Sequence, residues 1–148
     1  MSMMMETARA VAPPPLAATM AGPGLNLIVV EDDAADAHLI RQALQDMPKV
    51  ANIAFARDGV EALQMLERSP VTPDLAIIDL NMPRMDGFRL MIELACRRGE
   101  RFPIVVLTSS TANSDVIRSL LRGANRVVSK PDTLSELESA LASAIAAV

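Results

Sequence analysis

The stretch Leu25–Asp33, LNLIVVEDD, runs a nearly continuous series of aliphatic residues directly into three acidic ones. A short apolar run of this kind is typical of a parallel strand that is covered on both faces. In the following segment, Leu39, Ile40 and Leu44 share one face at helical spacing over Ala34–Asp46. The stretch therefore predicts a buried strand that leads into a covering helix.

The same alternation continues to the end of the chain. Strands are predicted at Leu25–Glu31, Ala51–Ala56, Leu75–Asp79, Ile104–Thr108 and Arg126–Ser129. Helical spacing follows each of them, at 34–46, 60–68, around 90–94, around 116–121 and at 134–148. This pattern predicts one α/β domain over residues 25–148, with a doubly wound, five-stranded parallel sheet and five helices. Residues 1–24, which contain Pro13–Pro15, are expected to form a disordered or extended N-terminal tail.

Composition disfavours several classes of function. The chain has 148 residues, of which 51% are hydrophobic and 22% charged, a balance typical of a globular protein. A formal charge of −4 and an aromatic content of 2% disfavour nucleic acid as a partner, because such partners require basic surfaces and stacking rings. No apolar run is long enough to cross a membrane. The lone cysteine, Cys96, excludes an internal disulfide and fits the reducing cytoplasm, where we expect the protein to act.

Polar residues gather where the predicted strands end, which is where open α/β sheets bind ligands. Asp32 and Asp33 follow the first strand, and Asp79 closes the third. Three crowded carboxylates raise one another's pKa, and a hard divalent cation relieves this repulsion. The sequence therefore predicts a Mg²⁺ site at Asp32, Asp33 and Asp79. An alternative is that Asp32 or Asp33 only caps the helix that begins near Ala34.

The end of the third strand also suggests a nucleophile. The carboxylate of Asp79 is expected to attack phosphorus and form an acyl phosphate. Lys130, one of only two lysines, follows the fifth strand and is expected to pair with Asp79 and then with the phosphoryl oxygens. Thr108 ends the fourth strand and can donate its hydroxyl to the same group, although a β-branched residue is also an ordinary strand residue.

Four separated motifs then resemble the receiver domain of bacterial two-component response regulators. They are Asp32-Asp33, the run Asp79–Gly87 (DLNMPRMDG), Thr108-Ser109 and Lys130-Pro131. The resemblance covers residues 25–148 and implies the flavodoxin-like receiver fold with strand order 2-1-3-4-5. Within the family, Glu31–Ile40 and Arg57–Leu63 are similar to the response regulators that serve phytochromes.

The resemblance implies a role for each motif residue. Asp79 would be the phosphorylation site and would receive its phosphoryl group from a sensor histidine kinase, with a bacteriophytochrome as the candidate. Mg²⁺ would be held by Asp32, Asp33, Asp79 and the backbone carbonyl of Asn81. Thr108 and Lys130 would contact the phosphoryl group and transmit its presence to the surface formed by the fourth helix, fifth strand and fifth helix.

One position departs from the family pattern. Receivers usually carry Tyr or Phe three residues before the lysine of the fifth strand, and this chain has Val127 there. A β-branched aliphatic residue has no ring to rotate and no hydroxyl to present. The departure puts the usual ring movement in doubt but leaves the phosphorylation chemistry untouched.

The expected function is that of a stand-alone receiver that signals through protein contacts and is not an enzyme beyond its own phosphorylation and slow dephosphorylation. A homodimer through the fourth helix, fifth strand and fifth helix is one such contact, although the apolar stripe of the last helix is expected mainly to face the sheet. A metal-dependent phosphohydrolase is disfavoured, because Asn81 stands where that class needs an acid/base carboxylate. An unphosphorylated adaptor receiver is the remaining alternative, and Val127 is the residue that favours it.

Overall fold

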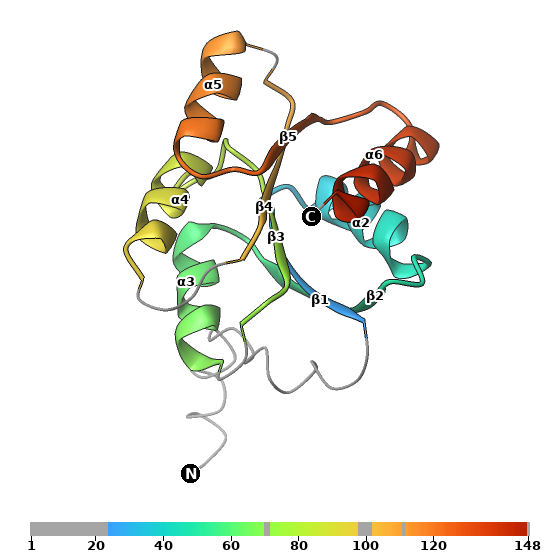
Figure 1. Cartoon of the computed structure of the whole chain (residues 1–148), viewed down its shortest axis with the longest axis horizontal. Coiled ribbons are helices and arrows are strands. Elements are labelled where there is room, and N and C mark those ends of the chain that lie inside the picture. Colours follow the sequence, from blue (N-terminus) through green and yellow to red (C-terminus); the bar gives the residue numbers. More distant parts are fainter. Residues whose placement is uncertain (1–23, 70–71, 98–101, 111, 148) are drawn as a thin grey trace.

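A computed structural model describes residues 24–69, 72–97, 102–110 and 112–147 (Figure 1). Strands and helices alternate along these residues, as predicted. The strands are β1 (Leu25–Val30), β2 (Val50–Ala56), β3 (Leu75–Ile78), β4 (Ile104–Thr108) and β5 (Arg126–Ser129). The helices are α2 (Ala34–Gln45), α3 (Gly59–Arg68), α4 (Gly87–Ala95), α5 (Asn113–Leu121) and α6 (Leu134–Ala146). Of the tail expected over residues 1–24, all but Gly24 lies outside the described residues.

The strands form one sheet in the order β2-β1-β3-β4-β5, and every neighbouring pair is parallel. This confirms the predicted flavodoxin-like topology. Figure 1 shows α3, α4 and α5 on one face of the sheet and α2 and α6 on the other. Because all strands run the same way, their carboxyl ends share one edge, and this edge carries the candidate site.

The residues of β1 explain why its sequence is apolar without interruption. Leu27 and Val29 pack into the cluster that contains residues of α2 and α6. Ile28 and Val30 point the other way, into the cluster beneath α3 and α4. All four side chains are buried. Successive side chains of a strand face opposite sides of the sheet, so a strand covered on both sides has no place for a polar residue.

Strand ends and helix caps fix which polar residues reach the carboxyl edge. β1 ends at Val30 and β3 ends at Ile78, each one residue before the predicted end. Glu31 and Asp79 are therefore the first residues beyond their strands. Three of the helices on the described part of the chain begin behind an aspartate whose side chain accepts a backbone N–H; these N-caps are Asp33 for α2, Asp58 for α3 and Asp86 for α4.

The last helix mainly covers the sheet, as expected. Leu137, Leu141 and Ile145 of its apolar stripe are buried, whereas Leu134 is partly exposed and Val148 lies outside the described residues. Helix α5 differs, because its only buried residue is Ser119. Among the described helices, none combines the length and the hydropathy needed to span a bilayer.

Candidate functional site

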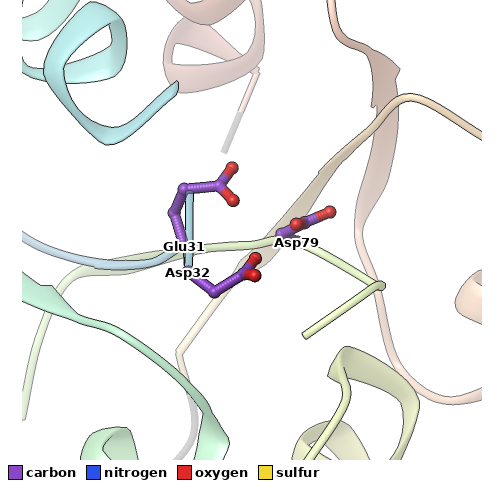
Figure 2. Close-up of side chains that lie close together, drawn as sticks. All are labelled: Glu31, Asp32 and Asp79. Carbon is purple, nitrogen blue, oxygen red and sulfur yellow. The ribbon is translucent and has the colours of Figure 1, made fainter. Parts of the chain in front are cut away.

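Three carboxylates meet at the carboxyl edge of the sheet (Figure 2). Glu31 and Asp32 follow β1, Asp79 follows β3, and carboxylate oxygens from all three lie within 4.8 Å of one another. Glu31 and Asp79 are buried while Asp32 is exposed, so the cluster opens to solvent on one side. The backbone N–H of Asp79 donates to the carbonyl of Val30 at 3.0 Å, which ties the two strand ends together. An open cluster of hard oxygen donors suits a divalent cation such as Mg²⁺.

Glu31 is the carboxyl group of this cluster whose pKa is shifted. Burial raises the pKa of Glu31, the charge of Asp79 raises it further, and the hydrogen bond and charge of Lys130 only partly oppose them, so that it reaches about 7. A carboxyl group with this pKa is largely protonated at mildly acidic pH. A bound cation would favour its ionised form.

Asp33 lies outside the cluster, so the structure does not bring together the three carboxylates of the predicted metal set. Its carboxylate accepts the backbone N–H of Asp36 at 2.9 Å and caps the first turn of α2. The predicted pair Asp32-Asp33 is thus displaced by one residue, and the pair beside Asp79 is Glu31-Asp32. The physical reason is the end of β1 at Val30, which places Glu31 against the sheet and leaves Asp33 to begin the helix. For Asp33, the alternative of an N-cap is the one observed.

Lys130 reaches this edge from the end of β5. Its ammonium lies 2.7 Å from Glu31 Oε1 and 2.8 Å from Asp36 Oδ2, but 3.6 Å from Asp79 Oδ2. Burial opposes the charge, yet the hydrogen bonds with Asp36 and Glu31 and the nearby charge of Asp79 raise the pKa of Lys130 above its ordinary value. The ammonium stays charged, and its two shorter contacts are not with the predicted phosphoacceptor.

Thr108 completes the edge from the end of β4. Its side chain is buried, and its hydroxyl oxygen accepts the backbone N–H of Ser110 at 3.1 Å. The carbonyl of Thr108 accepts the N–H of Lys130 at 2.8 Å, which joins the ends of β4 and β5. The hydroxyl proton of Thr108 therefore remains free to be donated elsewhere, since accepting a bond uses only a lone pair.

The loop between β3 and α4 is pressed closely against the site. Gly87 N–H donates to the carbonyl of Leu80 at 3.0 Å, and a Cβ at position 87 would overlap the carbonyl of Asp79. The loop also contains Asn81, which is exposed and whose N–H lies 3.5 Å from Asp79 Oδ1. Glycine is required here by close backbone approach, so the loop has little freedom to move away from Asp79.

Arg84 anchors the same loop to the start of α3. It adopts a φ of 61°, a left-handed conformation that is strained for a residue with a Cβ. Its Nε donates to the buried carboxylate of Asp58 at 2.7 Å. Burial raises the pKa of Asp58, but the bond from Arg84 and the backbone bond from Glu61 outweigh burial and hold that pKa below its usual range. The ion pair thus ties the loop to the N-terminal end of α3.

Val127 occupies the position where the sequence lacks an aromatic ring. It pairs with Val106 of β4 and packs, half-buried, against the cluster on the α3–α4 face. Phe88 belongs to the same cluster, and the guanidinium of Arg118 on α5 lies 4.0 Å from the centroid of its ring. A cation–π contact thus connects the start of α4 with α5.

Two residues of this site are not predicted by the sequence. Glu31 is predicted only as the last residue of its strand and not as a member of the acidic cluster. The signal that could have identified it is its place directly after an unbroken apolar run and before two aspartates. Asp36 has no comparable signal, because its partner Lys130 lies 94 residues away in the chain. Only the tertiary structure brings Asp36 and Lys130 together.

Comparisons with known proteins agree with this geometry. Residues 27–142 match the profile described as the response regulator receiver domain. Response regulator MprA of Mycobacterium leprae is 34% identical over 113 residues, which cover 76% of this chain and 47% of that protein. A protein-glutamate methylesterase/protein-glutamine glutaminase 3 of Geobacter sulfurreducens is 34% identical over 110 residues, which cover 72% of this chain and 28% of that protein. The chain thus matches half or less of the length of these curated relatives.

Two solved structures have a similar fold. The phosphorylated cyanobacterial phytochrome response regulator RcpA superposes with a TM-score of 0.72 at 31% identity, covering 78% of this chain and 87% of that one. The Mn²⁺-bound form of response regulator Rcp1 superposes with a TM-score of 0.70 at 30% identity, with the same coverage of 78% and 87%.

Proposed function

The chain belongs to the response regulator receiver domain family, and we propose that it accepts a phosphoryl group on Asp79 from the phosphohistidine of a sensor histidine kinase. The observation that carries the proposal is the set of charged groups around the buried carboxylate of Asp79. Asp79 lies beside two further carboxylates, Glu31 and Asp32, and 3.6 Å from the ammonium of Lys130. Cationic and anionic groups arranged in this way suit transfer of a strongly charged group.

The transfer is a substitution at phosphorus. A carboxylate oxygen of Asp79 forms a bond to phosphorus while the bond from phosphorus to the histidine nitrogen breaks. The electron pair of that bond returns to the imidazole. Lys130 pairs with a phosphoryl oxygen, and the free hydroxyl proton of Thr108 is donated to another. Both side chains stabilise charge that grows on the phosphoryl oxygens in the transition state.

Glu31, Asp32, Asp79 and the backbone carbonyl of Asn81 would hold Mg²⁺ in this reaction. The donors are all hard oxygens and the cluster is open on the side of Asp32, as a cation that keeps several waters needs. The similar response regulator Rcp1 has been solved in a Mn²⁺-bound form, which supports binding of a divalent cation. When bound, Mg²⁺ supplies positive charge that offsets the three carboxylates and the phosphoryl group.

The direct test is incubation with acetyl phosphate, with and without Mg²⁺, followed by intact-mass measurement. We expect one added phosphoryl group in the presence of Mg²⁺ and none in Asp79→Asn. Asp46→Asn, which removes a carboxylate from the exposed C-terminal end of α2, is the matched control and should be phosphorylated normally. Absence of a Mg²⁺-dependent adduct in the wild-type protein would contradict the proposal.

The proposed donor is a phytochrome-type histidine kinase acting in the cytoplasm. Support comes from the similarity to RcpA, a cyanobacterial phytochrome response regulator, and from the lone cysteine, which fits a reducing compartment. Phosphotransfer should be measured from a purified bacteriophytochrome kinase and from an unrelated histidine kinase at equal concentrations. A faster transfer from the unrelated kinase would contradict this choice of donor.

Signalling through a homodimer is the proposed output, with action as a stand-alone receiver remaining a prediction. The support is the outer surface of α5, where Ile117, Leu120 and Leu121 are 57%, 49% and 80% exposed. Large apolar side chains grouped on one helix are typical of a protein contact. Leu121→Asp should lower the mass measured by light scattering, in the free or the phosphorylated protein. Leu39→Asp, a 40% exposed residue on α2, is the control and should leave the mass unchanged.

A second candidate is a receiver that works as an adaptor without phosphorylation. Val127 favours it, because no ring is present at the position that usually responds to the phosphoryl group. The acetyl phosphate experiment separates the two candidates. Absence of a Mg²⁺-dependent adduct would favour the adaptor, and so would an adduct on Asp79 that leaves the light-scattering mass and partner binding unchanged.

A further inference from the structure

Lys130 is held more closely by other carboxylates than by the phosphoacceptor. Its ammonium is 2.7 Å from Glu31 Oε1 and 2.8 Å from Asp36 Oδ2, against 3.6 Å to Asp79 Oδ2. Glu31 belongs to the acidic cluster described above. Asp36 does not, because it projects from the first turn of α2 toward Lys130. Among the described residues, Asp36 is therefore the carboxylate that contacts Lys130 without belonging to the acidic cluster.

A backbone hydrogen bond and neighbouring side chains together set the position of Asp36. Its N–H donates to the Asp33 carboxylate at 2.9 Å, so the N-cap that starts α2 also sets the place of Asp36. Asp36 and Lys130 border a small cavity of about 30 Å³ whose other walls are largely apolar; they are formed by Leu39, Ile40, Leu107, Pro131 and Leu137. A charge pair beside apolar side chains is screened less by water than one on an open surface.

We propose that Asp36 is a positioning residue for Lys130, which holds the ammonium back from Asp79 until a phosphoryl group arrives. This inference rests on the proposed phosphorylation of Asp79. Asp36 competes with Asp79 for the same positive charge. A phosphoryl group adds negative charge and extra acceptor oxygens to the Asp79 side, and Lys130 then exchanges its bond with Asp36 for one to a phosphoryl oxygen.

The expected effect is modest because Asp36 is partly solvated. Its side chain is 39% exposed, whereas that of Lys130 is 17% exposed. A partly exposed ion pair contributes less free energy than a fully buried one, so breaking this pair should change the phosphorylation rate by about three- to tenfold. The direction follows from the competition: without Asp36, only Glu31 still holds Lys130 back, so the ammonium reaches the phosphoryl group more readily and phosphorylation is faster.

The first test measures the rate of phosphorylation by acetyl phosphate at saturating Mg²⁺. Asp36→Asn should be phosphorylated about three- to tenfold faster than the wild type, and Asp36→Glu should restore a rate near the wild-type value. Asp46→Asn removes the same charge from the opposite end of α2 and should have no effect. A slower reaction in Asp36→Asn, or an equal acceleration in Asp46→Asn, would overturn the proposal.

The second test measures the effect of Asp36 on Lys130 without any phosphorylation. Mn²⁺ affinity is measured by calorimetry for the wild type, Asp36→Asn, Lys130→Gln and the double variant. In Asp36→Asn, Lys130 moves toward Asp79 and opposes the cation, so affinity should fall by about three- to tenfold. In the Lys130→Gln background, the same change should have almost no effect. Equal losses in both backgrounds would show that Asp36 acts only as a nearby charge, and the positioning role would be wrong.

The two tests fail in different ways. A wild-type protein that takes up no phosphoryl group contradicts the proposed function, while the Mn²⁺ cycle still measures the coupling of Asp36 to Lys130. Conversely, normal phosphorylation with no such coupling leaves the proposed function in place and removes Asp36 from it.

Discussion

Replacing Gly87 by alanine tests how closely the loop after β3 is pressed against Asp79. A Cβ at this position would overlap the carbonyl oxygen of Asp79 and lie 2.9 Å from Cα of Leu80. Both neighbours are backbone atoms, so no side chain can rotate away. The φ of Gly87 is not in the left-handed region, and the expected effect is therefore purely steric.

The size of the effect follows from these contacts. Overpacking of a close-packed region costs about 1–3 kcal/mol, and the better helix propensity of alanine recovers only a part of this at the first position of α4. A net loss of about 1–2 kcal/mol in the free energy of unfolding should lower Tm by about 4–8 °C in a domain of this size. Because the displaced atoms belong to Asp79 itself, phosphorylation should slow by about ten- to a hundredfold.

Gly59 provides a matched control. It also opens a helix directly behind an aspartate N-cap, and a Cβ there would lie 2.7 Å from Cγ of Met85. That neighbour is a flexible side chain, so Gly59→Ala should lose less stability than Gly87→Ala and keep most of the phosphorylation rate. Unfolding is followed by circular dichroism, because the chain has no Trp and no Tyr for intrinsic fluorescence. A Gly87→Ala protein with wild-type Tm and wild-type rate would refute the reasoning.

Other predictions concern the charges around the site. At neutral pH, Arg84→Ala should be destabilised more than Arg84→Gly in urea, because glycine relieves the φ of 61°. Burial raises the pKa of Asp58, but the bond from Arg84 outweighs burial and lowers it. The stability that this ion pair contributes is therefore fully present above the pKa of Asp58 in the unfolded chain, and it is lost as the pH falls through the lower pKa of the folded protein. The free energies of unfolding of the wild type and Arg84→Ala should therefore become equal in acid. Asp33→Ala should cost about 1 kcal/mol of unfolding free energy without weakening Mn²⁺ binding, whereas Asp32→Ala should weaken Mn²⁺ binding. Because burial raises the pKa of Glu31 to about 7, Mn²⁺ affinity should rise as the pH increases through that value, and calorimetry of Glu31→Gln should show no such rise.

Much of this molecule is determined locally, and the sequence predicts it for that reason. A continuous aliphatic run of strand length is buried most readily in the middle of a sheet that is covered on both faces. The predicted and observed bounds of β1 accordingly agree to within one residue. The parallel arrangement then requires that residues at the ends of separate strands meet at one edge. For this reason the order of strands and helices along the chain is enough to predict that Asp79, Thr108 and Lys130 lie at one edge of the sheet.

Side-chain direction at that edge was decided by the tertiary structure. Whether Glu31 or Asp33 joins Asp32 depends on where β1 ends, since one residue of displacement moves a side chain from the cluster to the helix cap. The contact of Asp36 with Lys130 depends on α2 and β5 being brought together by the sheet between them. The order of residues along the chain is enough to predict which strands form and that acidic residues follow them. Which carboxylate faces Asp79 and which faces Lys130 depends on the packed fold, because strand ends, helix caps and residues far away in the chain set the direction of each side chain.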